Sequence, residues 1–267
     1  MFYQPRTLQE ALELRGRLRD DAVVVNGGTD VLVGMNHGTL RPRSFLDLSH
    51  LRDFNLIERD NGWLGLGAGT TFAQLGRLEI KCLREAALSV GGPQIRNAGT
   101  IGGNLVTASP AGDGIVALLA LEAQVEVASA ARGPRWLDLN EEWFLAYRKT
   151  ALQDDELVTH LRLRADFETA WYKIGKRGAV NISLVCCAVG RSPEGRYDLA
   201  FGSVAFRPIR APKAEQLLEG HTLTDEVIAQ AAEGVMQEVS PIDDHRAGAA
   251  YRRAMCGVLT RRLLREL

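Results

Sequence analysis

The amino-acid sequence predicts an α+β protein made of an N-terminal unit, residues 1–168, and a C-terminal unit, residues 169–267. Within the first unit, strand and helix patterns alternate and two glycine-rich segments interrupt them, which predicts two α/β subdomains of about 1–55 and 56–168. After residue 168 the pattern changes to successive strands followed by helices. This change predicts an antiparallel three-stranded sheet backed by helices.

The first subdomain opens with a capping-box pattern, Thr-x-x-Glu, in which Thr7 begins an amphipathic helix. A strand is expected at residues 22–25, directly before the first glycine-rich segment. Either Thr29 or Asp30 is placed to cap a following helix at residues 31–36.

The second subdomain contains a sequence that imitates a dinucleotide-binding fingerprint. Residues 65–69 read Gly-Leu-Gly-Ala-Gly, but Thr70 replaces the third glycine of G-x-G-x-x-G. A strand and a turn entering a helix capped by Thr71 explain the pattern better, so we expect no nicotinamide nucleotide there. A strand at 44–47 completes the first subdomain. The other elements expected in the second subdomain are strands at 63–67, 124–128 and 157–163 and helices at 73–78, 83–90 and 115–121. A loop with a short helix is expected within 132–149, where Trp136, Trp143, Phe144 and Tyr147 pack on the sheet.

The C-terminal unit should contain strands at 169–174, 182–189 and 197–205, then helices at 225–239 and 245–264. The last helix carries apolar residues at helical spacing, which predicts a face packed on the sheet. These residues are Tyr251, Met255, Val258 and Leu259.

The composition limits the classes of function. A chain of 267 residues with 46% hydrophobic content can bury a sizeable core. A net charge of −1 gives no electrostatic reason to expect a nucleic acid or an anionic membrane as partner. The longest apolar run, residues 115–121, is far shorter than the roughly 20 residues of a membrane-spanning helix. We therefore expect a cytoplasmic protein without a membrane span.

The four cysteines do not form a metal-binding pattern. They have no C-x-x-C spacing and no nearby histidine, so we expect neither a zinc site nor an iron–sulfur cluster in this chain. The cysteines are Cys82, Cys186, Cys187 and Cys256. Cys186 and Cys187 lie in an apolar run that predicts a buried strand.

The two glycine-rich segments indicate a bound pyrophosphate. Residues 24–31 read Val-Val-Asn-Gly-Gly-Thr-Asp-Val, and residues 97–104 read Asn-Ala-Gly-Thr-Ile-Gly-Gly-Asn. Glycine lets several N–H groups converge on phosphate oxygens, and Thr or Asn side chains add hydrogen bonds. One such segment is commonly a structural turn, but a pair favours a ligand held between the two. The candidate residues are Val25, Asn26, Gly27, Gly28, Thr29, Asp30 and Val31 in the first segment, and Thr100, Ile101, Gly102, Gly103 and Asn104 in the second.

The second segment and the residues after it, 95–113, resemble the FAD-binding signature of the molybdenum hydroxylase flavoproteins. These are the medium subunits of carbon monoxide dehydrogenases, xanthine dehydrogenases and aldehyde oxidoreductases. Gly-Gly-Thr-Asp at 27–30 matches their first loop, and the resemblance extends from residues 3–12 to Tyr-Arg-Arg at 251–253, essentially the whole chain. It implies FAD as the cofactor.

The resemblance also implies roles for two charged residues. Asp113 matches an aspartate that hydrogen-bonds the sugar-like chain of the flavin, a role that suits an acceptor-only carboxylate; the alternative is a cap for the helix at residue 115. Lys173 matches a lysine near the isoalloxazine; the alternative is a solvated basic hairpin at 173–177. Asn181 stands where many relatives carry aspartate, so their ion pair is not expected here.

The sequence contains no nucleophile paired with a base, so we assign no catalytic residue and expect electron transfer. The resemblance implies a FAD-binding subunit of a multi-subunit molybdenum hydroxylase. Its partners would be a molybdopterin-binding large subunit and a small subunit with 2Fe-2S clusters, in a dimer of heterotrimers, and electrons would pass to NAD⁺ or another acceptor. The alternatives are a self-sufficient flavin oxidase or dehydrogenase of a small substrate, and a non-catalytic scaffold subunit.

Overall fold

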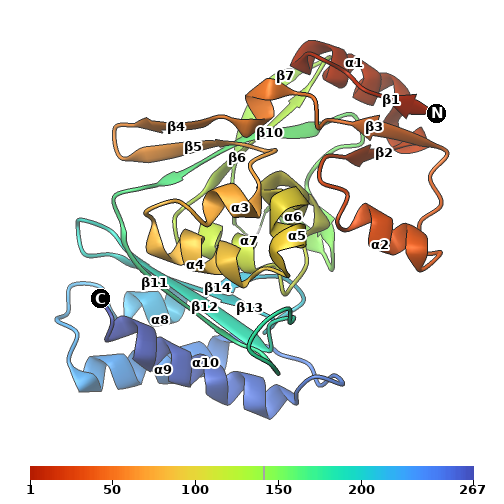
Figure 1. The fold of residues 1–267 in the computed structure, drawn as a ribbon. Helices are drawn as coiled ribbons and strands as arrows, with labels where there is room; N and C mark the ends of the chain where they lie inside the picture. Colours follow the sequence, from red (N-terminus) through yellow and green to blue (C-terminus); the bar gives the residue numbers. More distant parts are fainter. Residues whose placement is uncertain (141) are drawn as a thin grey trace.

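The computed structural model describes residues 1–140 and 142–267, which form stacked layers of sheet and helix (Figure 1). Two sheets from the N-terminal part of the chain lie above a central group of short helices. A third sheet lies below these helices, and the last helices of the chain cover its outer face (Figure 1).

The first sheet is parallel, and its carboxyl-terminal edge leads into the first glycine-rich segment. Its order is β1-β3-β2, where β1 is Phe2–Tyr3, β2 is Ala22–Val25 and β3 is Ser44–Asp47. Helix α1 (Leu8–Leu18) and a 3-10 helix, η1 (Arg19–Asp21), precede β2, and α2 (Val31–Asn36) follows the glycine-rich segment.

Helix capping in this sheet differs in detail from the sequence prediction. Thr7 Oγ1 accepts the Glu10 N–H at 3.2 Å as expected, but the Glu10 carboxylate accepts the N–H of Arg6 rather than that of Thr7. Asp30 occupies the N-cap of α2, yet its side chain makes no capping hydrogen bond. Its carboxylate instead pairs with Arg148 at 3.3 Å, because the β8–β9 turn described below brings that guanidinium alongside.

The second sheet has five strands in the order β4-β5-β10-β6-β7, with every neighbouring pair antiparallel. The strands are β4 (Ile57–Asp60), β5 (Trp63–Gly67), β6 (Gln124–Ser129), β7 (Gly133–Asp138) and β10 (Leu157–Arg164). A 3-10 helix, η2 (Arg52–Asn55), precedes β4. The imitation fingerprint at 65–69 is the end of β5 and the turn after it, as expected.

The expectation of a loop and short helix within 132–149 is wrong. This stretch forms the edge strand β7 and a small hairpin of β8 (Phe144–Ala146) and β9 (Lys149–Thr150). Trp143 and Phe144 are buried, but Trp136 is 40% exposed and lies on the Arg162 guanidinium, 4.6 Å from ring centroid to carbon. An edge strand with polar residues on both faces lacks the apolar alternation by which a strand is recognised.

The central helices separate the second sheet from the third. They are α3 (Phe72–Leu75), α4 (Lys81–Ser89), α5 (Pro93–Ala98), α6 (Ile101–Thr107) and α7 (Asp113–Leu119). Thr71 and Gln74 form the expected capping box of α3, with both reciprocal hydrogen bonds present. All residues of α7 are buried, which agrees with the long apolar run in the sequence.

The third sheet has the order β11-β12-β13-β14, so a short fourth strand extends the expected three. Its strands are β11 (Glu168–Ile174), β12 (Val185–Arg191), β13 (Tyr197–Gly202) and β14 (Ile209–Arg210). The helices that cover it are α8 (Pro212–Gln216), which the sequence did not predict, α9 (Asp225–Glu238) and α10 (Ala249–Leu264).

The buried face of α10 is displaced from the predicted one. Tyr251 and Val258 are 45% and 46% exposed, whereas Arg252 and Cys256 point inward with Leu259. An arginine interrupts the apolar pattern, and its buried position follows from backbone carbonyls that accept its hydrogen bonds.

Strand β12 shows how the third sheet is buried on both faces. Cys186 and Ala188 belong to the core shared with α7, whereas Val185, Cys187 and Val189 face α9 and α10. Successive side chains alternate between faces, so a strand between two cores reads as a continuous apolar run. Burial raises the pKa of both thiols well above the ordinary value, so they stay protonated.

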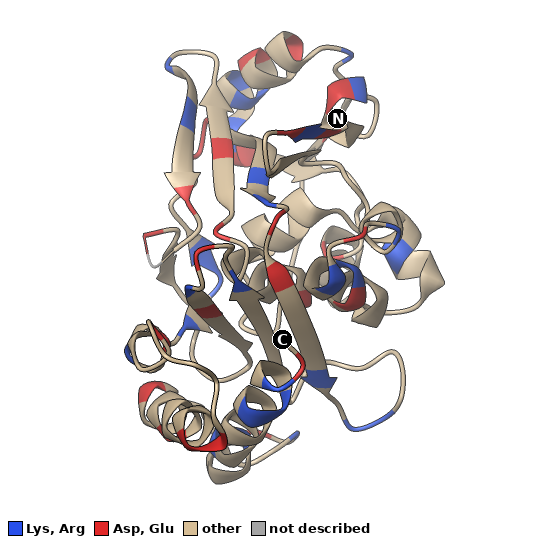
Figure 2. Ribbon diagram, turned by 90° about the vertical axis from the view of Figure 1, so that its left-hand side faces the viewer, with Lys and Arg blue, Asp and Glu red and all other residues tan. Residues whose placement is uncertain are grey.

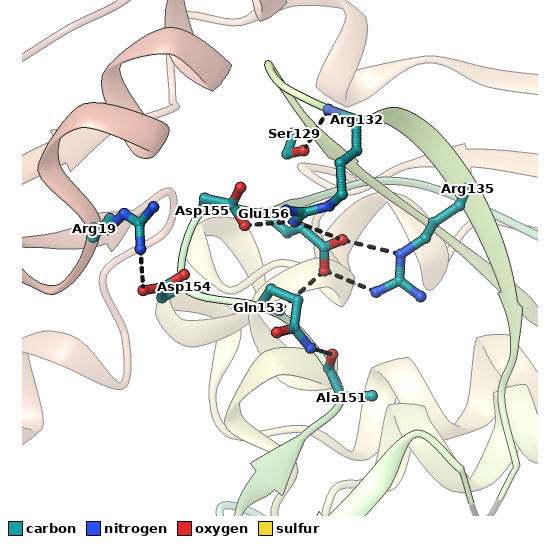
Figure 3. A network of polar contacts seen from close by, with 9 residues as sticks. All are labelled: Arg19, Ser129, Arg132, Arg135, Ala151, Gln153, Asp154, Asp155 and Glu156. Atoms are coloured by element: carbon teal, nitrogen blue, oxygen red, sulfur yellow. Dashed lines mark hydrogen bonds and ion pairs between the residues drawn. The ribbon is translucent and has the colours of Figure 1, made fainter.

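A network of ion pairs joins α1 to the second sheet (Figure 3). Arg19, at the end of α1, pairs with Asp154 at 3.1 Å. Next along the chain, Asp155 pairs with Arg132 at 2.6 Å, and the buried Glu156 accepts from Arg135 at 3.0 Å (Figure 3). These contacts fix the segment before β10 against β7 and α1.

Charges of both signs are interspersed on the strands and helices that Figure 2 turns toward the viewer. Across the described ranges, no helix is long and apolar enough to cross a membrane, and no group of three or more His, Cys, Asp or Glu residues could hold a metal ion.

Candidate functional site

The two glycine-rich segments, far apart in sequence, touch each other in the structure. A Cβ atom added to Gly27 would lie 1.8 Å from the carbonyl oxygen of Ala98, so only glycine allows this approach. Thr29 Oγ1 lies 3.3 Å from the position of a Cβ on Gly99. The turn after β2 therefore packs directly against the junction between α5 and α6.

The first segment presents free backbone donors. In the described part of the chain, no protein acceptor takes the N–H groups of residues 27–31. Gly28 has a φ of +69°, and such a change of backbone hand turns successive N–H groups toward one side. Unpaired N–H groups grouped in this way favour an anion.

The second segment differs from the expected loop, because it is a helix start whose backbone donors are already used. Thr100 is the N-cap of α6, and its Oγ1 accepts the Gly103 N–H at 3.2 Å. The N–H groups of Ile101 and Gly102 donate to Thr70 and Ala68 carbonyls, both at 2.9 Å. The buried side chain of Ile101 belongs to the core.

The second segment can contact a ligand through the exposed backbone of Gly103 and through the side chain of Asn104. A Cβ on Gly103 would meet only Thr100 Oγ1, at 3.0 Å, so the exposed face of Gly103 is open to a ligand. Asn104 Oδ1 is buried and has no hydrogen-bond partner in the described chain. An unpaired buried acceptor of this kind is rare and suits a donor from a bound molecule.

The remaining residues of the first segment support its conformation. The carbonyl of Val25 accepts the Leu48 N–H at 2.8 Å, which joins β2 to the segment after β3. Asn26 Nδ2 lies 3.0 Å from the Cβ position of Gly69, at the turn before α3. Val31 begins α2 and lines a groove described below.

Asp113 and Lys173, predicted at separate places, form a buried ion pair at 2.6 Å. Asp113 Oδ2 is also 3.3 Å from Ser89 Oγ, and Asp113 Oδ1 accepts from Ser183 Oγ. Lys173 Nζ donates to the Ser89 carbonyl at 3.1 Å. The side chains of the pair are 6% and 9% exposed, so the buried charges are matched and hydrogen-bonded, as such charges require.

This geometry decides against both alternative interpretations of the pair. Gly112, not Asp113, is the N-cap of α7, and no side-chain capping bond is present there. Lys173 is buried, whereas the solvated hairpin would expose it.

A cleft of about 560 Å³ opens beside Asp113. Its walls include Asn104 from α6 and three cationic side chains, Lys176, Arg177 and Arg246. Asn181, which donates to the Arg177 carbonyl, also lines it. Lys173 is not among the lining residues and adjoins the cleft only through Asp113.

A second groove, of about 520 Å³, borders the end of the first segment. It is lined by Asp30 and Val31 on one side and by Val106 and Thr107, at the end of α6, on the other. The groove thus borders the end of the first segment, and the cleft borders Asn104 at the end of the second.

Sequence reasoning missed the serines of the site. Ser89 ends α4, and Ser183 lies in the apolar run before β12, 70 residues after Asp113. A single polar residue within an apolar run was the available signal, because a buried hydroxyl needs a partner. The cations at 176–177 and 246 reach the cleft only through the folding of the third sheet.

Comparisons with known proteins agree with this geometry. A family model described as the FAD binding domain in molybdopterin dehydrogenase matches residues 1–163, and one described as the CO dehydrogenase flavoprotein C-terminal domain matches residues 170–267.

Curated relatives and solved structures match nearly the whole chain. The nicotinate dehydrogenase FAD-subunit of Eubacterium barkeri is 35% identical over 85% of this chain and 82% of its own length. The putative xanthine dehydrogenase FAD-binding subunit of Escherichia coli is 31% identical over 99% and 94%. A chain of carbon monoxide dehydrogenase from Hydrogenophaga pseudoflava superposes with a TM-score of 0.92 at 28% identity, covering 99% of this chain and 95% of that one. This protein therefore belongs to the family of FAD-binding flavoproteins of the molybdopterin dehydrogenases, which are oxidoreductases.

Proposed function

We propose that this chain is the FAD-binding electron-transfer subunit of a multi-subunit molybdenum hydroxylase. The observation that carries the proposal is the meeting of the two glycine-rich segments, with free N–H groups at 27–31, in a chain that matches FAD subunits along its length. None of the four buried cysteines is an activated nucleophile, since burial raises the pKa of Cys82 and of Cys256 to about 12 and holds the pKa values of Cys186 and Cys187 well above the ordinary value.

The residues of the site fit FAD. A pyrophosphate is an anion and suits the unpaired N–H groups of the first segment, while the open face of Gly103 leaves it space. Asn104 Oδ1, unpaired and buried, suits a donor on the ligand. The groove adjoins Asp30 and Val31 and the cleft adjoins Asn104, so each segment borders space for a part of a long dinucleotide.

Each part of the site would then have a distinct task. Residues 25–31 hold one phosphate by backbone donors, and residues 100–104 cover the other with bare backbone. Asp113 accepts from a hydroxyl of the flavin's sugar-like chain, and Lys173 provides positive charge near the ring. FAD, when bound, supplies the exchange of electrons, and these residues determine its position and potential.

The partners and the acceptor complete the proposal. Electrons would come from 2Fe-2S clusters on a small subunit, supplied by a molybdopterin-binding large subunit, in a dimer of heterotrimers in the cytoplasm. The flavin would pass the electrons to NAD⁺ or another acceptor. We also place the boundary between the FAD-binding unit and the C-terminal unit near residue 168.

The visible absorbance spectrum of the tagged chain, purified gently from its own cells, tests the proposal. We expect flavin bands overlaid with a broad iron–sulfur contribution, together with a larger and a smaller co-purifying subunit. Flavin bands on a chain without partners would replace the proposal by a self-sufficient flavin enzyme. A colourless chain that does not take up added FAD would leave a scaffold role.

A further inference from the structure

Arg252 of α10 is buried at a position where it holds two separate backbone segments. Its side chain is 4% exposed. Nη1 donates to the carbonyl of Leu184 at 2.7 Å and to that of Ser203 at 3.0 Å, and Nη2 pairs with Asp244 at 2.7 Å. A planar guanidinium can hold several acceptors in one fixed arrangement, which an ammonium cannot.

The segments that Arg252 holds converge on Ser183. Ser203 Oγ donates to the Ser183 carbonyl at 2.9 Å, and Leu184 directly follows Ser183. Ser203 has a φ of +65°, and its N–H donates to the carbonyl of Pro110 at 2.7 Å, in the turn that precedes α7. Ser183 is thus fixed from both sides, at 1% exposure.

The fixed Ser183 side chain in turn holds the Asp113 carboxylate in place. Its hydroxyl donates to Asp113 Oδ1, and Lys173 Nζ donates to Oδ2. Ser89 Oγ lies 3.3 Å from Oδ2 but directs its single proton to the Ala86 carbonyl at 2.7 Å. An ionised carboxylate accepts about four hydrogen bonds, so the two donors, Ser183 and Lys173, leave room for a ligand hydroxyl. The same guanidinium holds Asp244, which precedes the cleft-lining Arg246.

We propose that Ser183 and Arg252 are positioning residues for the flavin end of the site, acting on the ligand only through Asp113 and Lys173. The inference rests on the proposed FAD function and deepens it. The C-terminal helix thereby takes part in setting the flavin's affinity and potential, although it does not touch the ligand.

The direction of the effect follows from charge. Without the Ser183 hydroxyl, the negative charge of Asp113 is less neutralised and binds Lys173 more strongly. Electron addition to a nearby flavin then becomes less favourable, so its midpoint potential shifts to a more negative value. The phosphate end lies on other elements and should not respond.

The test uses the full-length chain carrying Ser183→Ala, with Ser192→Ala as matched control. Ser192 is also a buried serine of this unit, and its hydroxyl accepts an N–H from Arg196 in a hairpin turn. FAD binding, ADP binding and the flavin midpoint potential are measured for both. We expect Ser183→Ala to weaken FAD about tenfold, the loss of one charge-assisted hydrogen bond, and to shift the potential negatively, with ADP binding unchanged.

Arg252→Lys is the second variant, with Arg253→Lys on the exposed side of the same helix as its control. We expect a negative shift of potential for Arg252→Lys alone. An unchanged potential and FAD-to-ADP affinity ratio in Ser183→Ala would overturn the inference. A wild-type chain that binds no FAD would instead overturn the proposed function, so the two failures are distinguishable.

Discussion

At the scale of single residues, glycine is present in the two segments for different reasons. Gly27 is required by the fold, because any side chain would strike the Ala98 carbonyl. A Cβ on Gly103 would meet Thr100 Oγ1 at 3.0 Å, a tight contact with one side-chain atom rather than with the backbone that blocks Gly27. A ligand is the reason we propose for the second glycine.

We predict that Gly103→Val abolishes FAD binding and leaves the chain folded, because the branched side chain would occupy the ligand's space. Flavin fluorescence titration measures the binding, and circular dichroism checks the fold. Gly16→Val is the matched control, since Gly16 also lies in a helix and has nothing within 4 Å of its Cβ position. Stoichiometric FAD in Gly103→Val would contradict the assignment.

Asp113→Ala should weaken FAD binding by about 1–3 kcal/mol, the cost of leaving a buried polar partner unpaired. Isothermal titration measures the affinity, and urea unfolding separates it from the stability lost when Lys173 keeps a buried, unpaired charge. Unchanged flavin affinity would restrict Asp113 to its structural ion pair.

Asp198 illustrates a buried acid outside the site. It is fully buried beside Arg210, which it shares with Glu215, and its Oδ2 has no partner in the described chain. Burial, opposed by Arg210 and reinforced by Glu215, raises the pKa of Asp198 to about 7. Between its ordinary value of 3.8 and about 7, the folded state binds a proton that the unfolded state has released.

Stability should therefore fall as pH rises across this window, because the raised pKa disfavours the charged folded form. We predict that Asp198→Asn removes this slope and unfolds at a higher urea concentration than the wild type at pH 8. The two proteins should be similar at pH 4. Urea midpoints measured from pH 4 to 8 test this, and parallel curves would refute it.

At the scale of elements, the network around Glu156 fastens β10 to its neighbours (Figure 3). Burial alone would raise the pKa of Glu156, but hydrogen bonds from Arg135 and from the Gln153 N–H outweigh it and leave the pKa lowered. A lowered carboxyl pKa adds stability above the ordinary value of 4.5, and that stability is lost as pH falls through the folded-state pKa.

Glu156→Gln should lower the free energy of unfolding by about 2 kcal/mol at pH 7, within the range for hydrogen bonds to charged groups. The difference from wild type should shrink as pH falls from 4.5 through the lowered folded-state pKa, because the unfolded chain binds a proton there before the folded carboxylate does. Glu79→Gln removes an exposed pair with Arg59 and should change little. Equal losses of unfolding free energy in Glu156→Gln and Glu79→Gln would show that the buried ion pair stabilises the fold no more than the exposed one.

At the scale of the whole molecule, the core does not stop at residue 168. One apolar cluster contains Leu46 of the first sheet, Leu161 of the second, Ile115 of α7 and Cys186 of β12. A Cβ on Gly190 would lie 2.0 Å from the Ala120 carbonyl, which shows how closely α7 approaches the third sheet. The two segments matched by the family models, residues 1–163 and 170–267, therefore share one hydrophobic core.

We predict that the full chain unfolds in one cooperative transition. Urea curves followed by far-UV circular dichroism and by tryptophan fluorescence should coincide. Trp171 is the tryptophan of the third sheet, so Trp171→Phe restricts the fluorescence signal to the N-terminal unit. In this variant too, the urea midpoint measured by fluorescence should equal the midpoint measured by circular dichroism. Two separate transitions would indicate independent units.

Local sequence patterns were sufficient to predict the positions of most helices and strands. The helix at 31–36 and the strands at 22–25, 44–47 and 63–67 have the expected bounds, because capping residues, glycine turns and apolar runs are local signals. The family, and FAD as its cofactor, also followed from motifs, since close backbone approach to a ligand constrains residue type wherever it occurs.

The packing partners of each element depend on the three-dimensional arrangement. The edge strand β7, the inward Arg252 and the pairing of Asp113 with Lys173 and Ser183 depend on partners distant in sequence. An arginine is predicted to be exposed unless buried carbonyls are known to accept its hydrogen bonds. A serine in an apolar run gives no functional signal unless the buried carboxylate to which it donates is known. Such pairings arise from the three-dimensional arrangement, and local sequence patterns do not carry them.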